Sequence, residues 1–370
     1  MTHDVWVEVD LAALRHNLRR MRQVVGSGVK IMAVVKANGY GHGYVEPARA
    51  FVEAGADALA VTRIDEALTL RQAAVDAPIL LLAPVLPENA EAALEADLEM
   101  TVTDPTSAQA ISRSGVKMGK TARVHVKVDT GMGRLGLAPE DVPGLFQTIA
   151  LLPNISVAGT YTHFASAAEA DIGPARRQLE LFARLLTALE AMGFDRGLAH
   201  SANSAATLRM PEARLDMVRI GTLLYGQYPS AHVPHELDLA PTWSLKSRVC
   251  QVKELPAGSS IGYGEECVTK RRTRTAVIPV GWADGFTLVP EGPLYRQGIV
   301  SFAIRKLRRA PGVEVRGRWA RVLGRVAMQM TVIDVTDVPG VEVGDEVTIP
   351  ALRIPTSGLL PRVYADSQFG

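Results

Sequence analysis

The segment 31-IMAVVKANGYGHG-43 joins an apolar run to a turn that holds three glycines in five residues, at positions 39, 41 and 43. Such a run followed by glycines is typical of a buried strand that ends in a tight loop. Lys36 stands where the apolar run ends. Either its stem lies against the core while its amine reaches water, or its amine is a nucleophile held away from water. The other strand ends of the chain help to separate these two readings.

Seven similar apolar runs follow, at intervals that fit an alternation of strands and helices. With the first, they are 30-KIMAVVK-36, 57-DALAVT-62, 78-PILLLA-83, 98-LEMTVT-103, 123-RVHVKVD-129, 155-ISVAGTYTH-163, 197-GLAHS-201 and 216-DMVRIG-221. Eight strands alternating with helices over about 230 residues predict a (β/α)8 barrel. An open, doubly wound sheet is the alternative, because periodicity does not show whether the sheet closes.

Helical periodicity separates most of these runs. The longest helical stretch, 175–193, carries one apolar stripe that consists of Leu179, Phe182, Leu185, Leu186 and Leu189. A stripe of this kind is expected to pack one face of the helix against the sheet.

The pattern changes after Pro241, where strand-like segments follow one another without a long helical stripe. They are 243-WSLKSRVCQVKEL-255, 273-TRTAVIPV-280, 321-RVLGRVAMQMTVIDV-335 and 341-VEVGDEVTI-349. We therefore predict a barrel over residues 1–235 and a mostly β domain over 236–370, with 1–10 as a candidate strand of the second domain. The basic stretch 296–325 predicts a solvated hairpin surface, since no aromatics interleave its arginines as in a nucleic-acid platform.

Composition excludes several classes of protein. Hydrophobic residues make up 47% and charged residues 21%, which fits a globular core, and the net charge of +1 provides no field for nucleic acid or an acidic membrane. Two cysteines, Cys250 and Cys267, suit neither a disulfide framework nor a zinc knuckle. The N-terminus lacks the apolar region of a signal peptide, and the chain has no span of about 20 apolar residues. We expect a cytoplasmic protein without a metal, nucleic acid or membrane partner.

Reactive side chains recur where the predicted strands end. They are Lys36, Lys127 with Asp129, His163, His200 with Ser201, and Arg219. In a barrel these ends converge on one pocket. A lysine there loses part of its preference for the charged form and can form an imine with an aldehyde. The stretch 201-SANSAATL-208 predicts a helix whose first N–H groups can bind phosphate. A ligand that carries both an aldehyde and a phosphate would suit these two features, which points to pyridoxal 5′-phosphate (PLP).

The same residues lie in motifs that resemble the alanine racemases, PLP-dependent barrel enzymes of fold type III. The resemblance runs from 5-VWVEVDLAALRHNL-18 to about Gly344. Its motifs are VVKANGYGHG, 127-KVDTGMGRLG-136, 161-YTHFASA-167, 200-HSANSAATLRMPEARLDMVRIGTLLYGQYPS-230, 262-GYGEEC-267, 278-IPVGWADGF-286 and 324-GRVAM-328. It implies racemisation of L- and D-alanine, which supplies D-alanine for peptidoglycan.

The resemblance also implies roles for individual residues. Lys36 would bind the cofactor and act as one of two proton-transfer bases, and Tyr263 of the partner subunit would be the other, so the active sites would be shared in a homodimer. Arg219 would hydrogen-bond the pyridine nitrogen and leave it unprotonated, because a guanidinium does not give up its proton. Arg134 and the Met328 N–H would hold the substrate carboxylate.

The remaining positions would support these groups. Lys127 matches a lysine that is often carbamylated in this family and braces Arg134, while His200 lies behind Arg219. The residues matched to the cofactor are Tyr40, His163, Asn203, Ser204, Gly221 and Thr222, of which Tyr40, Ser204, Gly221 and Thr222 surround its phosphate.

Three positions depart from the family pattern. Trp282 replaces the usual tyrosine at the entrance, and Gln329 replaces the aspartate after Met328. The segment 344–364 is abbreviated, lacks the usual helix, and places Gly358 where a phosphate-binding tyrosine is expected, since Tyr364 belongs to a different position. These departures leave open a racemase of serine, lysine, arginine or broad specificity.

Two further classes fit less well. A PLP-binding protein without turnover is the first, but such chains end after the barrel. The barrel-plus-β decarboxylases are the second, but they place an acid where this chain has Arg219.

Overall fold

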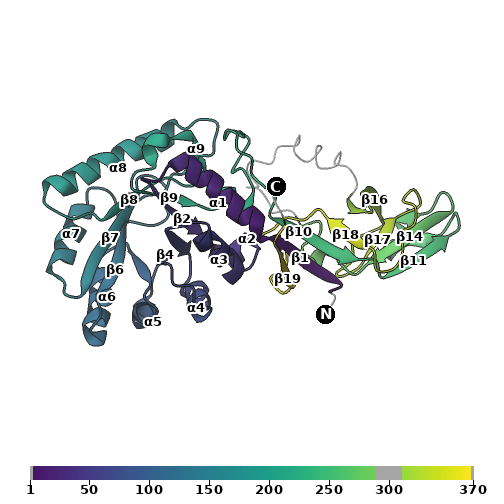
Figure 1. Ribbon diagram of the computed structural model, residues 1–370, viewed down its shortest axis with the longest axis horizontal. Helices are drawn as coiled ribbons and strands as arrows, with labels where there is room; N and C mark the ends of the chain where they lie inside the picture. The colour runs from purple at the N-terminus through teal and green to yellow at the C-terminus, as the bar shows by residue number, and fades with distance from the viewer. Residues whose placement is uncertain (1–2, 289–310, 368–370) are drawn as a thin grey trace. The chain divides into compact units, whose positions relative to one another are not determined.

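The computed structural model describes residues 3–288 and 311–367 (Figure 1). These residues form two compact units. One consists of residues 10–242 and 366–367, and the other consists of residues 3–9, 243–288 and 311–365. The boundary lies between Thr242 and Trp243 because the polar stretch before it packs within the barrel unit. Asn17 donates to the Ala240 carbonyl (3.0 Å) and accepts from the Ala240 N–H (2.8 Å).

Eight parallel strands form the centre of the barrel unit (Figure 1). They are β2 (Lys30–Val34), β3 (Ala58–Val61), β4 (Ile79–Pro84), β5 (Glu99–Val102), β6 (Ala122–Lys127), β7 (Ile155–Tyr161), β8 (Leu198–His200) and β9 (Met217–Ile220). Their order is β8-β7-β6-β5-β4-β3-β2-β9. The Asp216 N–H donates to the Ala199 carbonyl (3.1 Å), and the Arg219 N–H donates to the Ala202 carbonyl (2.9 Å), which brings β9 against β8. The predicted barrel is therefore confirmed, and the open sheet is excluded.

Helices of the described barrel unit alternate with these strands. They are α1 (Leu11–Val25), α2 (Lys36–Tyr40), α3 (Val45–Glu53), α4 (Ile64–Gln72), α5 (Ala90–Glu95), α6 (Pro105–Met118), α7 (Val142–Leu151), α8 (Gly173–Ala191) and α9 (Ser204–Arg209). Local signals mark their ends. Asp10 and Asp104 cap α1 and α6 by accepting from the N–H groups of Ala13 (2.9 Å) and Ser107 (2.8 Å). Left-handed Gly119 (φ 64°) then ends α6.

The stripe of α8 packs against the barrel largely as predicted. Phe182, Leu185, Leu186 and Leu189 are buried, whereas Leu179 is half-buried. Its neighbour Gln178 is buried instead, because its amide makes several hydrogen bonds within the barrel.

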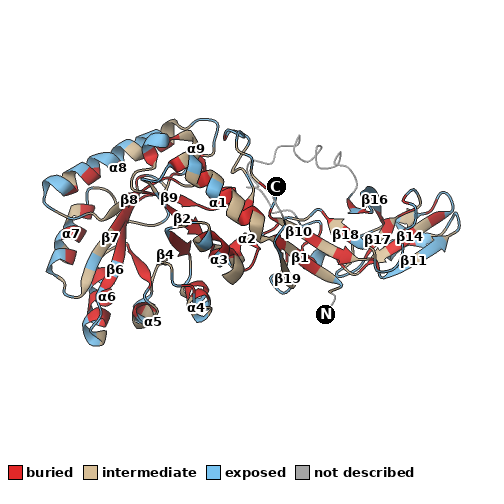
Figure 2. Ribbon diagram, in the orientation of Figure 1, coloured by how far each residue is buried: buried red, intermediate tan, exposed pale blue. Residues whose placement is uncertain are grey.

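The barrel strands are buried on both faces, as a parallel sheet covered by helices requires. Figure 2 shows most of these strands in red, with the first part of β7 in tan and blue, and the outer side of α8 largely in blue. Met32, Val34, Ala60, Leu80 and Met217 belong to one buried cluster inside the barrel. This packed interior holds the strand ends, and therefore the pocket, in fixed positions.

The second unit is mostly β. Its main sheet has the order β11-β14-β17-β16-β15-β18-β10-β1-β19. The strands of the unit are β1 (Val5–Asp10), β10 (Trp243–Arg248), β11 (Gln251–Leu255), β12 (Ser260–Ile261), β13 (Cys267–Val268), β14 (Thr273–Ile278), β15 (Gly312–Val315), β16 (Arg318–Leu323), β17 (Thr331–Asp334), β18 (Glu346–Ile349) and β19 (Arg362–Ala365). The N-terminal strand β1 pairs antiparallel with β10, from Val5 opposite Ser247 to Val9 opposite Trp243.

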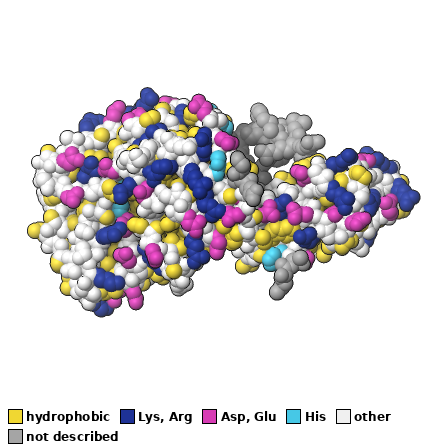
Figure 3. Space-filling model, viewed as in Figure 1, with side chains coloured by type: hydrophobic (Ala, Val, Ile, Leu, Met, Phe, Trp, Pro, Cys, Tyr) yellow, Lys and Arg dark blue, Asp and Glu magenta, His cyan; other side chains and the backbone are white. Residues whose placement is uncertain are grey.

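The surface carries charges of both signs. On the face drawn in Figure 3, Lys and Arg side chains alternate with Asp and Glu. Residues 296–310 of the basic stretch lie outside the described residues, and 311–325 forms the hairpin of β15 and β16. None of the helices in the described chain is both long and apolar enough to cross a membrane.

Candidate active site

A cavity of about 430 Å³ opens at the carboxyl ends of the barrel strands. This is the end at which (β/α)8 enzymes carry their active sites. Ten residues singled out in the sequence line it: Lys36, Tyr40, Lys127, Arg134, His163, Asn203, Ser204, Arg219, Gly221 and Thr222. Four of these residues are lysines or arginines, so the pocket favours an anionic ligand.

Lys36 does not end β2 but begins the short segment α2. The following residues Ala37, Asn38, Gly39 and Tyr40 all have φ between 53° and 55°, which forms a turn of left-handed helix where an irregular loop was expected. Each non-glycine residue in this conformation costs about 1–2 kcal/mol, so surrounding contacts must stabilise the turn.

Glu66 of α4 supplies several of these contacts. Its carboxylate is buried and accepts hydrogen bonds from the N–H groups of Ala37 (2.8 Å), Thr62 (2.8 Å) and Arg63 (3.1 Å). The Tyr44 hydroxyl donates to the same group (3.3 Å). A buried carboxylate with this many donors joins the Lys36 turn to the ends of β3 and α4.

The amine of Lys36 is easier to deprotonate than that of a free lysine. Burial lowers its pKa below the ordinary 10.5, and the positive charge of Arg134 lowers the pKa further, while Glu66 partly opposes them. A larger fraction of the amine is therefore neutral near pH 7–8, which is the form that attacks a carbonyl carbon.

Arg219 is the most extensively bonded cation of the pocket. Its Nη1 donates to the Nδ1 (2.9 Å) and to the carbonyl (2.9 Å) of His200. Its Nη2 donates to the carbonyls of Thr162 (2.7 Å) and Ser201 (3.2 Å). The same Nη2 lies 3.3 Å from His163 Nδ1. Burial lowers its pKa only to about 10, so it stays charged at neutral pH. None of these five contacts uses the Nε–H, which is left for a ligand in the pocket.

Two further basic groups of the pocket, His163 and Lys127, are neutral or half-neutral at pH 7. Burial, then the charges of Arg219 and Arg134, lower the pKa of His163 to about 3. Burial and the charge of Arg219 also lower the pKa of Lys127 to about 7. The Lys127 amine donates to the Val128 carbonyl (2.6 Å). His200 does not line the cavity and lies fully buried behind Arg219.

The loop that carries Arg134 is held by Asp129. One carboxylate oxygen of Asp129 accepts from the N–H groups of Gly131 (3.0 Å), Met132 (2.8 Å) and Gly133 (3.1 Å). Gly136 (φ 109°) closes the loop, and a Cβ there would lie 2.7 Å from the Lys127 carbonyl. These contacts place the exposed Arg134 at the edge of the cavity.

Tyr40, Ser204 and Gly221 form a cradle at one side of the cavity. The Gly221 N–H donates to Ser204 Oγ (3.0 Å), and a Cβ at Gly221 would lie 2.4 Å from the Tyr40 hydroxyl oxygen. Asn203 caps α9 by accepting from the Ala206 N–H (3.0 Å), and Thr222 begins the 3-10 turn Thr222–Tyr225 after β9. Hydroxyl and backbone N–H groups gathered at one side of a cavity are donors that suit a phosphate group.

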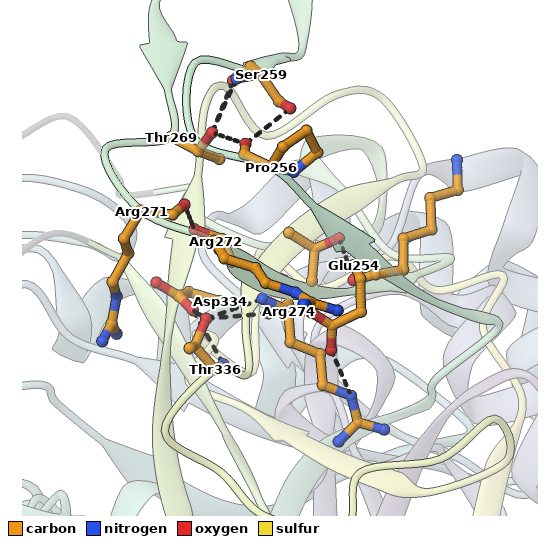
Figure 4. Close-up of polar contacts among 12 residues, drawn as sticks. Glu254, Pro256, Ser259, Thr269, Arg271, Arg272, Arg274, Asp334 and Thr336 are labelled. Carbon is orange, nitrogen blue, oxygen red and sulfur yellow. Dashed lines mark hydrogen bonds and ion pairs between the residues drawn. The ribbon is translucent and has the colours of Figure 1, made fainter.

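Tyr263 lies in the β unit, in the 3-10 turn Tyr263–Glu265 between β12 and β13, and its side chain is 74% exposed. Polar contacts hold the base of this hairpin (Figure 4): the Ser259 N–H donates to Thr269 Oγ1 (2.9 Å), which donates to the Pro256 carbonyl (2.7 Å). At the tip, Glu266 accepts from Arg325 Nε (2.6 Å).

Two of the departures from the family pattern lie in adjoining loops of the β unit. The Trp282 N–H donates to the Ala327 carbonyl (3.1 Å), and the Ala283 N–H donates to the Met328 carbonyl (3.0 Å). Gly281 permits this approach, since a Cβ there would lie 2.1 Å from the Ala327 carbonyl oxygen. Met328 and Gln329 are exposed. The described residues 350–361 form turns without a helix, as the abbreviated sequence predicts, and Tyr364 lies in β19.

Among the residues around the pocket that were not singled out from the sequence, Tyr161 and Glu66 contribute most to its polar structure. Tyr161 ends β7 and lines the cavity, and the Arg219 guanidinium lies 5.1 Å from the centre of its ring. The rule that strand ends build the site could have identified it. Glu66 carried no comparable signal, because an acid in the first turn of a helix is ordinary.

Comparison with known proteins places these features in a family. The models of the alanine racemase N-terminal and C-terminal domains match residues 9–229 and 242–356. The chain is 40% identical to an alanine racemase of Halothermothrix orenii over 94% of this chain and 88% of that one. It is 42% identical to alanine racemase 2 of Caldanaerobacter subterraneus, over 93% of this chain and 84% of that one.

Solved structures agree with this match. An alanine racemase of Clostridium difficile aligns with a TM-score of 0.90 and 31% identity, over 99% of this chain and 97% of that one. The alanine racemase of Bacillus anthracis with bound L-Ala-P aligns with a TM-score of 0.84 and 32% identity, over 99% and 96% of the two chains. Both domains of the family model, these relatives and the shared fold together show that the chain belongs to the alanine racemase family.

Proposed function

We propose that this protein racemises L- and D-alanine with PLP as its cofactor. The observation that carries the proposal is one barrel pocket that holds an amine with a lowered pKa, a charged arginine whose described contacts all use Nη1 and Nη2, and a cradle of hydroxyl and backbone N–H groups. The names of the relatives support the same reaction.

The residues of the pocket fit this cofactor. Lys36 would hold it covalently, the cradle of Tyr40, Ser204, Gly221 and Thr222 would bind its phosphate, and the Nε–H of Arg219 would donate to its ring nitrogen. When bound, PLP delocalises the negative charge that develops on the substrate Cα. Because Arg219 stays charged, it has no proton-accepting role, and the ring nitrogen stays an acceptor.

Racemisation needs a proton removed from one face of Cα and returned on the other. Lys36 would serve one face, since its lowered pKa lets its amine both accept and release a proton near neutral pH. Tyr263 would serve the other face. Arg134, at the edge of the cavity, would bind the substrate carboxylate together with the Met328 N–H.

We propose that Tyr263 reaches the pocket of a partner subunit, so that the protein works as a homodimer with shared sites. The exposure of Tyr263 (74%) and Met328 (58%) supports this, because large apolar side chains exposed on one subunit are typical of an interaction surface. The free thiols of Cys250 and Cys267 fit a reducing cytoplasm, where D-alanine for peptidoglycan would be made.

The test is to incubate the purified protein with PLP and single enantiomers of several amino acids, and to follow each by chiral chromatography. Alanine should racemise fastest. Faster turnover of serine, lysine or arginine would instead assign the substrate to another amino acid, with Trp282, Gln329 and the missing helix as the candidate determinants. Cofactor binding without any racemisation would favour a PLP-binding protein and contradict the proposal.

We also predict that Lys127 is carbamylated. With a pKa of about 7, half of its amine is neutral at neutral pH, and that form adds CO2 to give a carbamate with release of one proton. The resulting anion would lie near Arg219 and Arg134, whose charges lower the Lys127 pKa. A 13C NMR spectrum in 13C-bicarbonate should show one carbamate carbon that is missing in Lys127→Met. The same signal in both proteins would assign the carbamate elsewhere.

A further inference from the structure

A chain of hydrogen-bonded side chains runs through the barrel core, away from the pocket. Beyond the bond from Arg219 to His200 Nδ1 (2.9 Å), His200 Nε2 lies 2.9 Å from His125 Nδ1, and His125 Nε2 lies 3.0 Å from Glu99 Oε2. All four residues are buried. The chain therefore connects a residue of the pocket to a carboxylate at the first position of β5.

Glu99 lies at the opposite mouth of the barrel. Together with His125 and Arg123 it lines a second cavity, of about 220 Å³. The first residues of several other strands line the same cavity, namely Lys30, Ala58, Leu198 and Met217. Since parallel strands begin at one end of the barrel, this cavity lies at the amino ends, whereas Lys36 follows a carboxyl end.

The hydrogen-bonded series from Arg219 to Glu99 allows only one arrangement of protons while both imidazoles are neutral. A guanidinium only donates, and a neutral imidazole has one donor and one acceptor nitrogen. His200 Nδ1 must therefore accept from Arg219, His200 Nε2–H donates to His125 Nδ1, and His125 Nε2–H donates to the Glu99 carboxylate. Burial keeps both rings neutral by lowering the pKa of His200 well below its ordinary range and that of His125 to about 3.

The fold makes room for this chain. His125 pairs with Gly159 across β6 and β7, where the register shifts, and a Cβ at Gly159 would lie 2.5 Å from His125 Nδ1. The His200 ring stacks on Tyr161, with centroids 4.8 Å apart and planes 7° apart. A glycine and a stacked aromatic ring thus hold both imidazoles in register for these bonds.

We propose that Glu99 is a positioning residue for Arg219 and acts on it through His125 and His200 from the other mouth of the barrel. Its carboxylate accepts the last proton of the chain, so that His200 keeps Nδ1 as an acceptor and Arg219 keeps its Nε–H toward the pocket. The proposal rests on the proposed function only in naming the cofactor ring nitrogen as the partner of that Nε–H.

The alternative is that Glu99 serves only its ion pair with Arg123, whose side chain is 47% exposed while that of Glu99 is 10% exposed. Two variants separate these roles. Glu99→Leu removes the acceptor of His125 and the ion pair, whereas Arg123→Ala removes the ion pair alone. A role in the ion pair predicts equal effects of the two variants, and a role through the histidines predicts an effect of Glu99→Leu only.

The first measurement is long-range 15N–1H NMR of the full-length protein labelled at histidine. In the native protein both rings should be protonated at Nε2 and not at Nδ1. Glu99→Leu should shift the nitrogens of His125 and His200, and Arg123→Ala should leave them in place. If Glu99→Leu does not fold, the double variant Glu99→Gln with Arg123→Ala takes its place. Its amide oxygen can still accept from His125 Nε2–H, and Arg123 no longer competes for that oxygen, so the histidine spectrum should stay native.

The second measurement is the affinity for pyridoxine 5′-phosphate, which has no aldehyde for Lys36. Glu99→Leu should raise its dissociation constant about tenfold, and Arg123→Ala by less than about twofold. Equal effects of both variants, or a native His125 protonated at Nδ1, would overturn the proposal. Native protein that fails to bind pyridoxine 5′-phosphate would count against the cofactor site instead, and the histidine spectra would still decide the role of Glu99.

Discussion

Lys36→Ala should abolish racemisation, because this change removes both the covalent anchor of the cofactor and one of the two bases. Loss of a base alone lowers kcat by roughly 10²–10⁴-fold. The absorbance of the cofactor imine should disappear in the same variant. In the native protein this absorbance should form with a midpoint below pH 10.5, because burial and Arg134 lower the pKa of the amine that must be deprotonated. Absorbance titration with PLP and chiral chromatography measure the two effects.

Lys30→Ala is the matched control for this variant. Lys30 begins the strand β2 that precedes Lys36, and its side chain is exposed at the other end of that strand. Both the absorbance and the racemisation should remain as in the native protein. A Lys36→Ala protein that still forms the imine would assign the cofactor to another lysine, and Lys127, in the same cavity, would be the first to examine.

Tyr263→Phe should lower racemisation by roughly 10²–10⁴-fold while it leaves PLP binding unchanged, because the phenol is proposed as a base and not as a cofactor ligand. With only Lys36 left to remove a proton, one enantiomer of alanine should still exchange its α-hydrogen in D2O, and the other should not. Proton NMR measures the exchange, and chiral chromatography measures the racemisation. Exchange of both enantiomers at native rates would contradict the two-base mechanism.

Tyr364→Phe is the control, since it removes a phenol from β19 of the same unit. It should change neither the rate of racemisation nor the rate of α-hydrogen exchange.

Mixing Lys36→Ala with Tyr263→Phe tests whether the site is shared between subunits. If Tyr263 comes from the partner, mixed dimers contain one site with both residues intact, and random pairing should restore about one quarter of the native activity. If each subunit forms its own site, the mixture should stay as inactive as its components.

Much of the fold could be predicted from the sequence because it depends on local patterns. Each apolar run from 30–36 to 216–221 overlaps a barrel strand, and the period of 175–193 identifies α8. Several site residues could be predicted as well, because a barrel brings the carboxyl ends of its strands and the residues that follow them to one mouth. Lys36, Lys127, His163 and Arg219 follow this rule and line one cavity.

The sequence by itself thus determined the strands, the helices, the order of the domains and the reactive residues at the strand ends. Only the tertiary structure decided that the sheet closes, since the contact of β9 with β8 joins segments whose own patterns are the same in an open sheet. It also decided the left-handed turn after Lys36, because the Glu66 carboxylate that holds this turn comes from another helix. The hydrogen-bonded series from Arg219 to Glu99 depends on the register of neighbouring strands. That register brings side chains that are far apart in the sequence within hydrogen-bonding distance, and no local sequence pattern specifies it.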